Sequence, residues 1–191
     1  MLDNVYPNVV KGPPRPSAIS QPRVFSMPPG TERYVVEGCG AILIPVEAGD
    51  KVTVINDEGG QSCELIAVDS KGKMDPGIVG DGANGDGRGL MALLTSSNQS
   101  LRGLRMGLDA RGIDLAQAQS VTFFETTTPA KTEVEFPIQR DGSVIISAPH
   151  PNPDGAMDYE AQDTATPLVV MVKRAVIKPH KGFELPDPLA D

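Results

Sequence analysis

Glu47–Asp69 reads EAGDKVTVINDEGGQSCELIAVD and decides the fold of this 191-residue chain. Val52 and Val54 alternate with residues of the opposite face, the pattern of a β-strand with one buried side. Asp57–Gly60 interrupts the pattern with two glycines, which adopt the positive φ angles that tight turns need. Ser62–Val68 predicts a second strand. We expect the two strands to pair as a hairpin that needs further strands to cover its apolar face.

The remaining β-rich segments extend this pattern through most of the chain. They are Arg33–Glu37, Ala41–Val46, Leu90–Leu94, Val121–Thr126, Glu133–Gln139, Ser143–Ser147 and Pro167–Lys173. Arg140-Asp141-Gly142 predicts a second hairpin between the runs that flank it. About eight to ten short strands are expected, in a mainly all-β fold closed as a β-barrel or packed as a two-sheet sandwich, which limits exposed edges.

One α-helix is expected near 98–111, after the potential N-cap residues Ser96–Asn98. Three leucines at positions i, i+3 and i+7 give it an apolar face: Leu101, Leu104 and Leu108. Gly112 is a suitable C-terminal cap. Gly103 and Gly107 are poor helix formers, and their spacing of four would let the helix approach a neighbouring element closely.

Proline content divides the chain into three parts. Residues 1–30 form a proline-rich N-terminal arm, because proline fixes φ and removes an amide donor. Residues 31–177 form a single β-rich domain of ordinary size. Residues 178–191 form a C-terminal linker or arm. The chain contains 20 glycines and 18 prolines, which favours turns and short strands over long helices.

The formal net charge of −8 argues against a nucleic-acid partner and against binding to an anionic membrane surface. No apolar run has the length of a membrane span, and the first residues lack the layout of a signal peptide. Cys39 and Cys63 do not make a disulfide framework. We therefore expect a cytoplasmic protein with reduced thiols.

The motif Gly49-Asp-Lys-Val-Thr-Val followed by Asp57-Glu-Gly-Gly-Gln-Ser-Cys-Glu-Leu resembles the signature of the urea-carboxylase-associated family. The resemblance covers roughly residues 30 to 70, and beyond them mainly the order of strands agrees. A domain of this kind precedes folate-binding aminomethyltransferase domains, notably in trimethylamine N-oxide demethylases.

The resemblance implies an amino-terminal domain or small subunit of a folate-linked enzyme that removes a one-carbon unit from a methylated amine. The chain would shape assembly and substrate binding. It would hold no cofactor itself, with tetrahydrofolate and a possible zinc ion on a larger partner domain or subunit. Enzymatic members are expected to bind zinc through cysteines further along the chain, and this sequence has none after Cys63. Homo-oligomerisation is also plausible, because sheet edges invite it.

Two groups of residues are candidates for chemistry. Glu58, Gln61 and Glu64 in the signature turn would line a polar pocket. His150 lies in a proline-stiffened segment near Asp154, where imidazole and carboxylate could form a metal site or an acid–base pair. Alternatively, His150 bonds a backbone carbonyl in a turn.

A metal held by Cys63, His150 and a carboxylate would instead make the chain a stand-alone hydrolase or deiminase of the urea-carboxylase-associated type. A buried, apolar role for the cysteine is the structural alternative. A small-ligand binding module without catalysis is the third functional interpretation.

Overall fold

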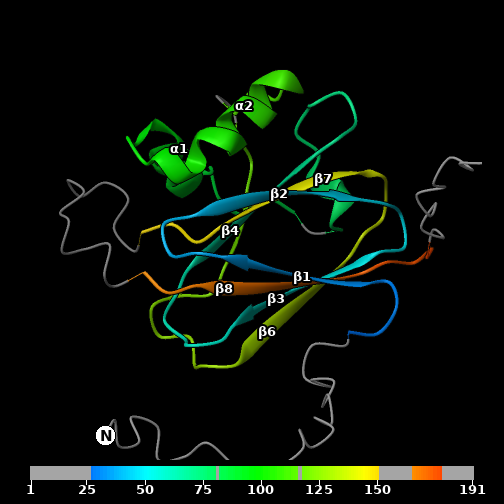
Figure 1. Ribbon diagram of the computed structural model, residues 1–191, viewed down its shortest axis with the longest axis horizontal. Coiled ribbons are helices and arrows are strands. Elements are labelled where there is room, and N and C mark those ends of the chain that lie inside the picture. Colours follow the sequence, from blue (N-terminus) through cyan, green and yellow to red (C-terminus); the bar gives the residue numbers. More distant parts are fainter. Residues whose placement is uncertain (1–26, 81, 116–117, 151–164, 178–191) are drawn as a thin grey trace, which may run out of the picture.

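The computed structural model describes residues 27–80, 82–115, 118–150 and 165–177, which form two four-stranded antiparallel sheets packed face to face (Figure 1). Sheet A contains, in spatial order, β1 (Thr31–Val36), β8 (Leu168–Lys173), β3 (Lys51–Asn56) and β6 (Thr132–Pro137). Sheet B contains β2 (Ala41–Val46), β7 (Gly142–Ser147), β4 (Cys63–Val68) and β5 (Val121–Phe123). The mainly β fold is confirmed as a sandwich of eight strands, and it is not a closed barrel.

Both hairpins predicted from the sequence are wrong. β3 lies in sheet A and β4 in sheet B, and β6 and β7 are divided in the same way. The turns at 57–60 and 140–142 are real, but each carries the chain from one sheet to the other. The physical reason is burial: Val52 and Val54 pack across the sandwich against the inner face of sheet B, which buries more apolar surface than an isolated hairpin would.

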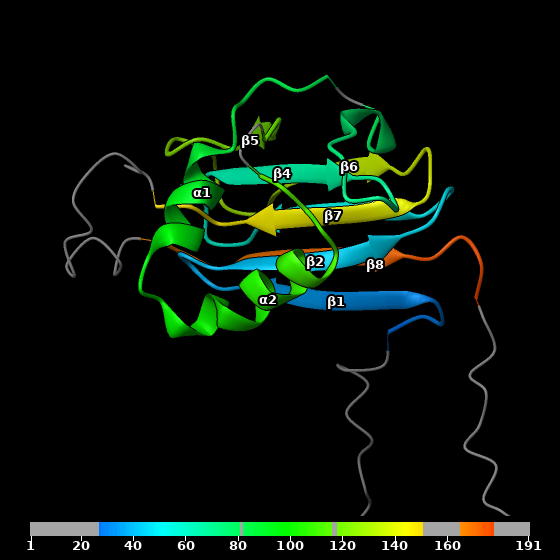
Figure 2. The ribbon, with the colours of Figure 1, turned by 90° about the horizontal axis from the view of Figure 1, so that it is seen from above.

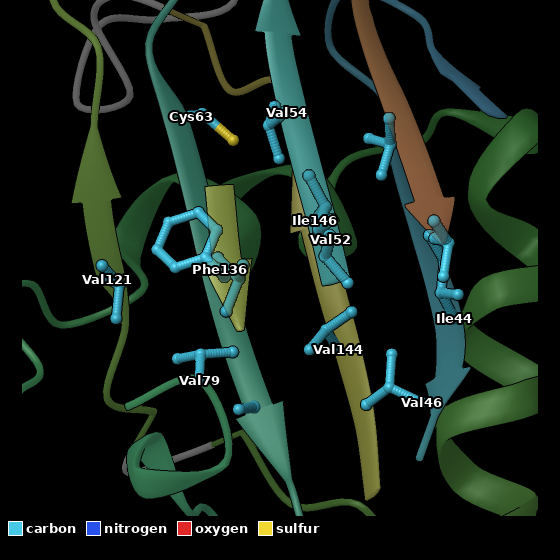
Figure 3. Close-up of a cluster of buried hydrophobic side chains, with 14 of the residues drawn as sticks. Ile44, Val46, Val52, Val54, Cys63, Val79, Val121, Phe136, Val144 and Ile146 are labelled. Carbon is cyan, nitrogen blue, oxygen red and sulfur yellow. The ribbon is translucent and has the colours of Figure 1, made fainter. Parts of the chain in front are cut away.

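The main core fills the space between the sheets (Figure 3). Strand β4 is buried on both faces, since its inner face meets sheet A and its outer face lies under the helices. Leu65 points inward, whereas Ile66 belongs to the outer cluster. Because both faces are apolar, the sequence of β4 reads as a nearly continuous hydrophobic run.

Two helices cover the outer face of sheet B: α1 (Arg88–Thr95) and α2 (Arg102–Ala110) (Figures 1 and 2). A short 3-10 turn (Gln99–Leu101) leads into α2, so the helix predicted near 98–111 is confirmed. The strand predicted at Leu90–Leu94 is wrong, because this segment lies within α1. Its leucine, methionine and alanine residues are strong helix formers without β-branching. A second 3-10 turn lies at Pro76–Ile78.

Gly112 ends α2 as expected, with a φ angle of 63° and an amide that donates to the carbonyl of Asp109. The close approach expected at Gly103 is wrong, because a Cβ atom built there would meet no heavy atom within 4 Å. Strand β1 begins at Thr31, where the predicted domain starts. Of the two predicted arms, residues 1–26 and 178–191 lie outside the described residues.

Candidate functional site

The signature turn between β3 and β4 is held by its own side chains. The Oδ1 atom of Asn56 accepts a 3.0 Å hydrogen bond from the Gly59 amide, and its Nδ2 atom donates to the carbonyl of Gln61 at 2.8 Å. Gly59 has a φ angle of 84°, and a Cβ atom there would lie 2.7 Å from the Ala130 nitrogen. The two-glycine turn is therefore required both by its backbone angles and by the close approach of residue 130.

Gln61 joins three segments that are distant in sequence. Its side chain is 1% exposed. The Nε2 atom donates to the carbonyls of Ser62 and Pro149, both at 2.8 Å. The Oε1 atom accepts from the amide of Thr166 at 2.9 Å. Both donor hydrogens are thus used by carbonyl oxygens of the fold, and Gln61 fixes the loops after β7 and before β8 against the signature turn.

Glu64 projects from β4 to the beginning of α1. Its carboxylate accepts hydrogen bonds from the Gly89 amide at 3.1 Å and from the Leu90 amide at 2.8 Å. These amides lie in the first turn of the helix, where N–H groups have no partner within the helix. A negative charge at this end is also favoured by the helix dipole. Glu64 therefore anchors α1 on sheet B.

The opposite end of α1 meets a positive charge. The guanidinium of Arg105, on α2, donates to the carbonyl oxygens of Leu94, Ser96 and Asn98 at distances from 2.5 to 2.9 Å. These carbonyls lie at and just beyond the C-terminus of α1, where a cation is favoured. Opposite charges from β4 and α2 thus hold the two ends of the helix.

The remaining predicted site residues lie in different environments. Glu58 is exposed on the turn, and His150 is partly buried just after β7. Cys63 is 0% exposed and lies on the inner face of β4 within the core (Figure 3), where burial raises the pKa of its thiol well above the usual range. Asp154 lies outside the described residues. Within the part of the chain that the structure describes, no three His, Cys, Asp or Glu residues are grouped as metal ligands. The metal site at Cys63 and His150 stays a prediction.

Sequence reasoning missed a second polar cluster at the end of sheet A. Arg174 follows β8 and forms a two-pronged pair with Glu32, at 2.8 and 2.6 Å. Its Nη1 atom donates to Asp50 and to the carbonyl of Pro45, both at 2.8 Å. The cluster borders a cavity of about 430 Å³ that is also lined by Val176 and Ile177.

The pKa values of the two carboxyl groups in this cluster are lowered. For Glu32 the main cause is the hydrogen bond from Arg174. Burial alone would raise the pKa of Asp50, but hydrogen bonds from the Ala175 amide, Arg174 and the Glu47 amide outweigh it. No local sequence motif predicts the cluster, because Arg174 is 142 positions from Glu32 and 124 from Asp50.

Comparison with known proteins places these features in context. No family model matches the chain. A trimethylamine-oxide aldolase from Ruegeria pomeroyi (strain ATCC 700808 / DSM 15171 / DSS-3) is 58% identical over 191 residues, which is 100% of this chain. The chain is similar to one segment of that enzyme. It spans 24% of the relative's length.

A solved structure also matches, at a lower level. It is the crystal structure of a DUF1989 family protein from Silicibacter pomeroyi DSS-3, which is 15% identical and covers 83% of each chain with a TM-score of 0.43. A similarity of this extent does not establish a shared fold. The link to urea-carboxylase-associated proteins stays a prediction, whereas the methylated-amine context agrees with the 58% identical relative.

Among the described residues, no helix has both the length and the apolar character required to cross a bilayer.

Proposed function

We propose that this chain is a domain or small subunit of an aldolase-type demethylase that acts on a methylated amine oxide such as trimethylamine N-oxide. The observation that carries this proposal is the 58% identity that extends along all 191 residues to a segment of a trimethylamine-oxide aldolase. Because the identity covers the whole chain, we take the segment to have the same fold in both proteins.

The reaction of such an enzyme is an internal cleavage. Trimethylamine N-oxide, C3H9NO, divides into dimethylamine, C2H7N, and formaldehyde, CH2O, so that atoms and electrons balance without an external oxidant. Tetrahydrofolate would accept the one-carbon unit on another domain or subunit. We place any catalytic zinc on that other part as well, because this sequence has no cysteine after Cys63.

The geometry supports a scaffold role for this chain. Gln61 and Glu64, two of the polar residues that follow the glycines of the signature, both form hydrogen bonds with backbone groups of the fold. Neither presents an unused donor to a substrate through these atoms. In our proposal the signature fixes the sandwich and α1 in the shape that the larger assembly needs.

The test is to isolate the native assembly that contains this chain from its source cell, by an affinity tag, and to determine its mass. We expect a species much heavier than the 20.2 kDa chain. This species should release dimethylamine and formaldehyde in equal amounts from trimethylamine N-oxide. The isolated chain at the same concentration should release neither. A homo-oligomer without a larger partner, or turnover by the isolated chain, would overturn the proposal.

A matched pair of variants sharpens this test within the assembly. Glu58→Ala changes an exposed turn residue and should leave mass and turnover within about twofold, as for most surface substitutions. Gln61→Glu should weaken the fold and reduce the amount of assembly together with turnover. If Glu58→Ala removed about a hundredfold or more of turnover from an intact assembly, the size typical of a general acid or base, catalysis would lie on this chain.

A further inference from the structure

The two sheets differ in what covers their outer faces. The outer face of sheet B carries α1 and α2, whereas no described helix lies on the outer face of sheet A (Figures 1 and 2). Four apolar side chains alternate with core residues and therefore point outward from sheet A: Val35, Ile55, Val169 and Met171. None of them belongs to a hydrophobic cluster of the described residues, and Val35 is 40% exposed.

The strand register arranges this outer face in rows across sheet A. One row runs Arg33, Met171, Thr53, Glu135, and the next runs Val35, Val169, Ile55, Glu133. The centre of the face, on β8 and β3, is therefore mainly apolar. Arg33 lies at the β1 edge, and the two glutamates lie at the β6 edge. Among the described residues, neither Arg33 nor Glu133 has an ion pair in its own chain.

The charge of the face differs from that of the whole chain. The four strands direct three basic side chains (Arg33, Lys51 and Lys173) and two acidic ones (Glu133 and Glu135) outward from sheet A. The chain as a whole carries a net charge of −8, so two copies repel each other over most of their surfaces. The outer face of sheet A escapes this repulsion, because its charges nearly balance.

We propose that the outer face of sheet A binds the same face of a second copy of this chain, about a two-fold axis parallel to the strands. Such an axis places β8 of one copy over β3 of the other, with Val169 against Ile55. It also places the β1 edge of each copy over the β6 edge of its partner, with Arg33 over Glu135 and Val35 over Glu133. Closed two-fold pairing requires a self-complementary surface, and aligned sheet packing is a common way to bury one.

The lysines of the face lie at its rim. Lys51 and Lys173 occupy the row at one end of the strands, next to Thr31 and Pro137. Lys51 is already paired with Glu135 at 2.8 Å. Long lysine side chains at a rim keep their charged ends in water. They therefore oppose the pairing less than charges at the centre would.

The size of the face sets the expected strength of the dimer. Four strands about 4.8 Å apart and about six residues long give roughly 400 Å² in plan on each copy. That area corresponds to the small end of specific interfaces, so we expect a dissociation constant in the range of about 1 to 100 μM.

The experiment is sedimentation equilibrium on the 191-residue chain at concentrations above and below that range. We expect a monomer–dimer equilibrium. Arg33→Glu alone and Glu135→Arg alone should each weaken dimerisation by about tenfold or more, because like charges at positions 33 and 135 then oppose each other twice per dimer. Equal amounts of the two variants, when mixed, should recover a heterodimer, because every reversed charge then faces its opposite. Arg102→Glu, an exposed change on α2, is the matched control and should leave the equilibrium unchanged.

Circular dichroism of each variant confirms folding before the comparison. A chain that stays monomeric through this concentration range would overturn the proposal, and would assign the face to another part of a longer polypeptide. Single variants that dimerise as the natural chain does, or a mixture that fails to recover, would also overturn it. Recovery of the heterodimer in the mixture supports this arrangement, because a two-fold axis perpendicular to the strands would instead place residue 33 of each copy over β1 of its partner.

Discussion

The side-chain amide of Gln61 donates a 2.8 Å hydrogen bond to the carbonyl oxygen of Pro149, which lies 88 positions further along the chain. The same side chain accepts a bond from the amide of Thr166, 105 positions away. One fully buried amide group therefore closes the ends of the loops around β7 and β8 onto the signature turn. Loss of this amide group should therefore lower the stability of the whole sandwich.

Gln61→Glu tests this role with almost no change in shape. The carboxylate would face the carbonyls of Ser62 and Pro149 without a hydrogen to donate, so we expect a loss of about 3 kcal/mol in the free energy of unfolding at pH 7. Because the folded state favours the protonated acid, the loss should shrink as the pH falls toward 5. Urea denaturation at both pH values measures the effect, and equal losses at the two values would contradict it.

Glu64→Ala should loosen α1. The change leaves the amides of Gly89 and Leu90 without their acceptor and removes the charge at the helix N-terminus. We expect about 1 to 2 kcal/mol of destabilisation, and faster hydrogen exchange at these two amides than in the strands. Glu58→Ala, on the exposed turn, is the control and should change stability by less than about 0.5 kcal/mol. Unchanged exchange at residues 89 and 90 would show that Glu64 does not anchor the helix.

Two glycine-to-alanine changes in the helices should have opposite signs. Gly103→Ala places a methyl group in open space on α2 and should stabilise the chain by about 0.5 to 1 kcal/mol through helix propensity. Gly89→Ala places a methyl group 2.5 Å from the Cβ atom of Pro149 and 3.1 Å from the Glu64 carboxyl carbon. Overpacking there should destabilise by about 1 to 3 kcal/mol. Thermal melting of both variants measures the difference, and equal shifts would contradict the described packing around α1.

Acid should weaken the fold through the Arg174 cluster. The pKa values of Glu32 and Asp50 are lowered in the folded chain, so their ion pairs contribute full stability above the unfolded values of about 4. This contribution is lost as the pH falls from about 4.5 through the lower folded values. Asp50→Asn should flatten the decline in urea midpoint between pH 5 and pH 3 and lower stability at pH 7. An equally steep decline in the variant would show that Asp50 does not carry it.

Both thiols should react slowly in the native chain. Cys63 is 0% exposed and Cys39 is 4% exposed, and burial raises the pKa of each. Thiolate is the reactive form, so labelling with a disulfide reagent at pH 8 should follow local opening or unfolding. Stoichiometric labelling of either cysteine within the mixing time would contradict its described burial.

The sequence predicted strand positions better than strand partners. Alternation of apolar residues, as in Val52 and Val54, depends only on which side of a strand is buried, and it gives a predicted run that overlaps each of the eight described strands. Strand pairing depends on contacts with the opposite sheet, and the local sequence carries no information about those contacts. Adjacent strands joined by a turn at Gly59 and Gly60 therefore looked like a hairpin although they face each other across the core.

The partners of the candidate site residues are also absent from the local sequence. The sequence predicts that Gln61 and Glu64 line a polar pocket, whereas in the structure they bond backbone groups at 149, 166 and 89–90, far along the chain. When only the local sequence is considered, a polar side chain whose backbone partners are distant resembles a residue that binds a substrate or metal. The sequence does not predict the Arg174 cluster, because its two carboxylate partners, Glu32 and Asp50, are 142 and 124 positions away.

The position of β8 has a consequence for how the chain is made. This strand, the last among the described residues, lies in the middle of sheet A between β1 and β3 and hydrogen bonds to both. During synthesis, sheet A therefore has a gap until residue 173 has left the ribosome, and the earlier strands cannot close around it. Contacts of such long sequence separation make folding slow. A fragment that stops before Leu168 should remain unfolded, and the nascent chain stays exposed to chaperones and proteases until its final strand arrives.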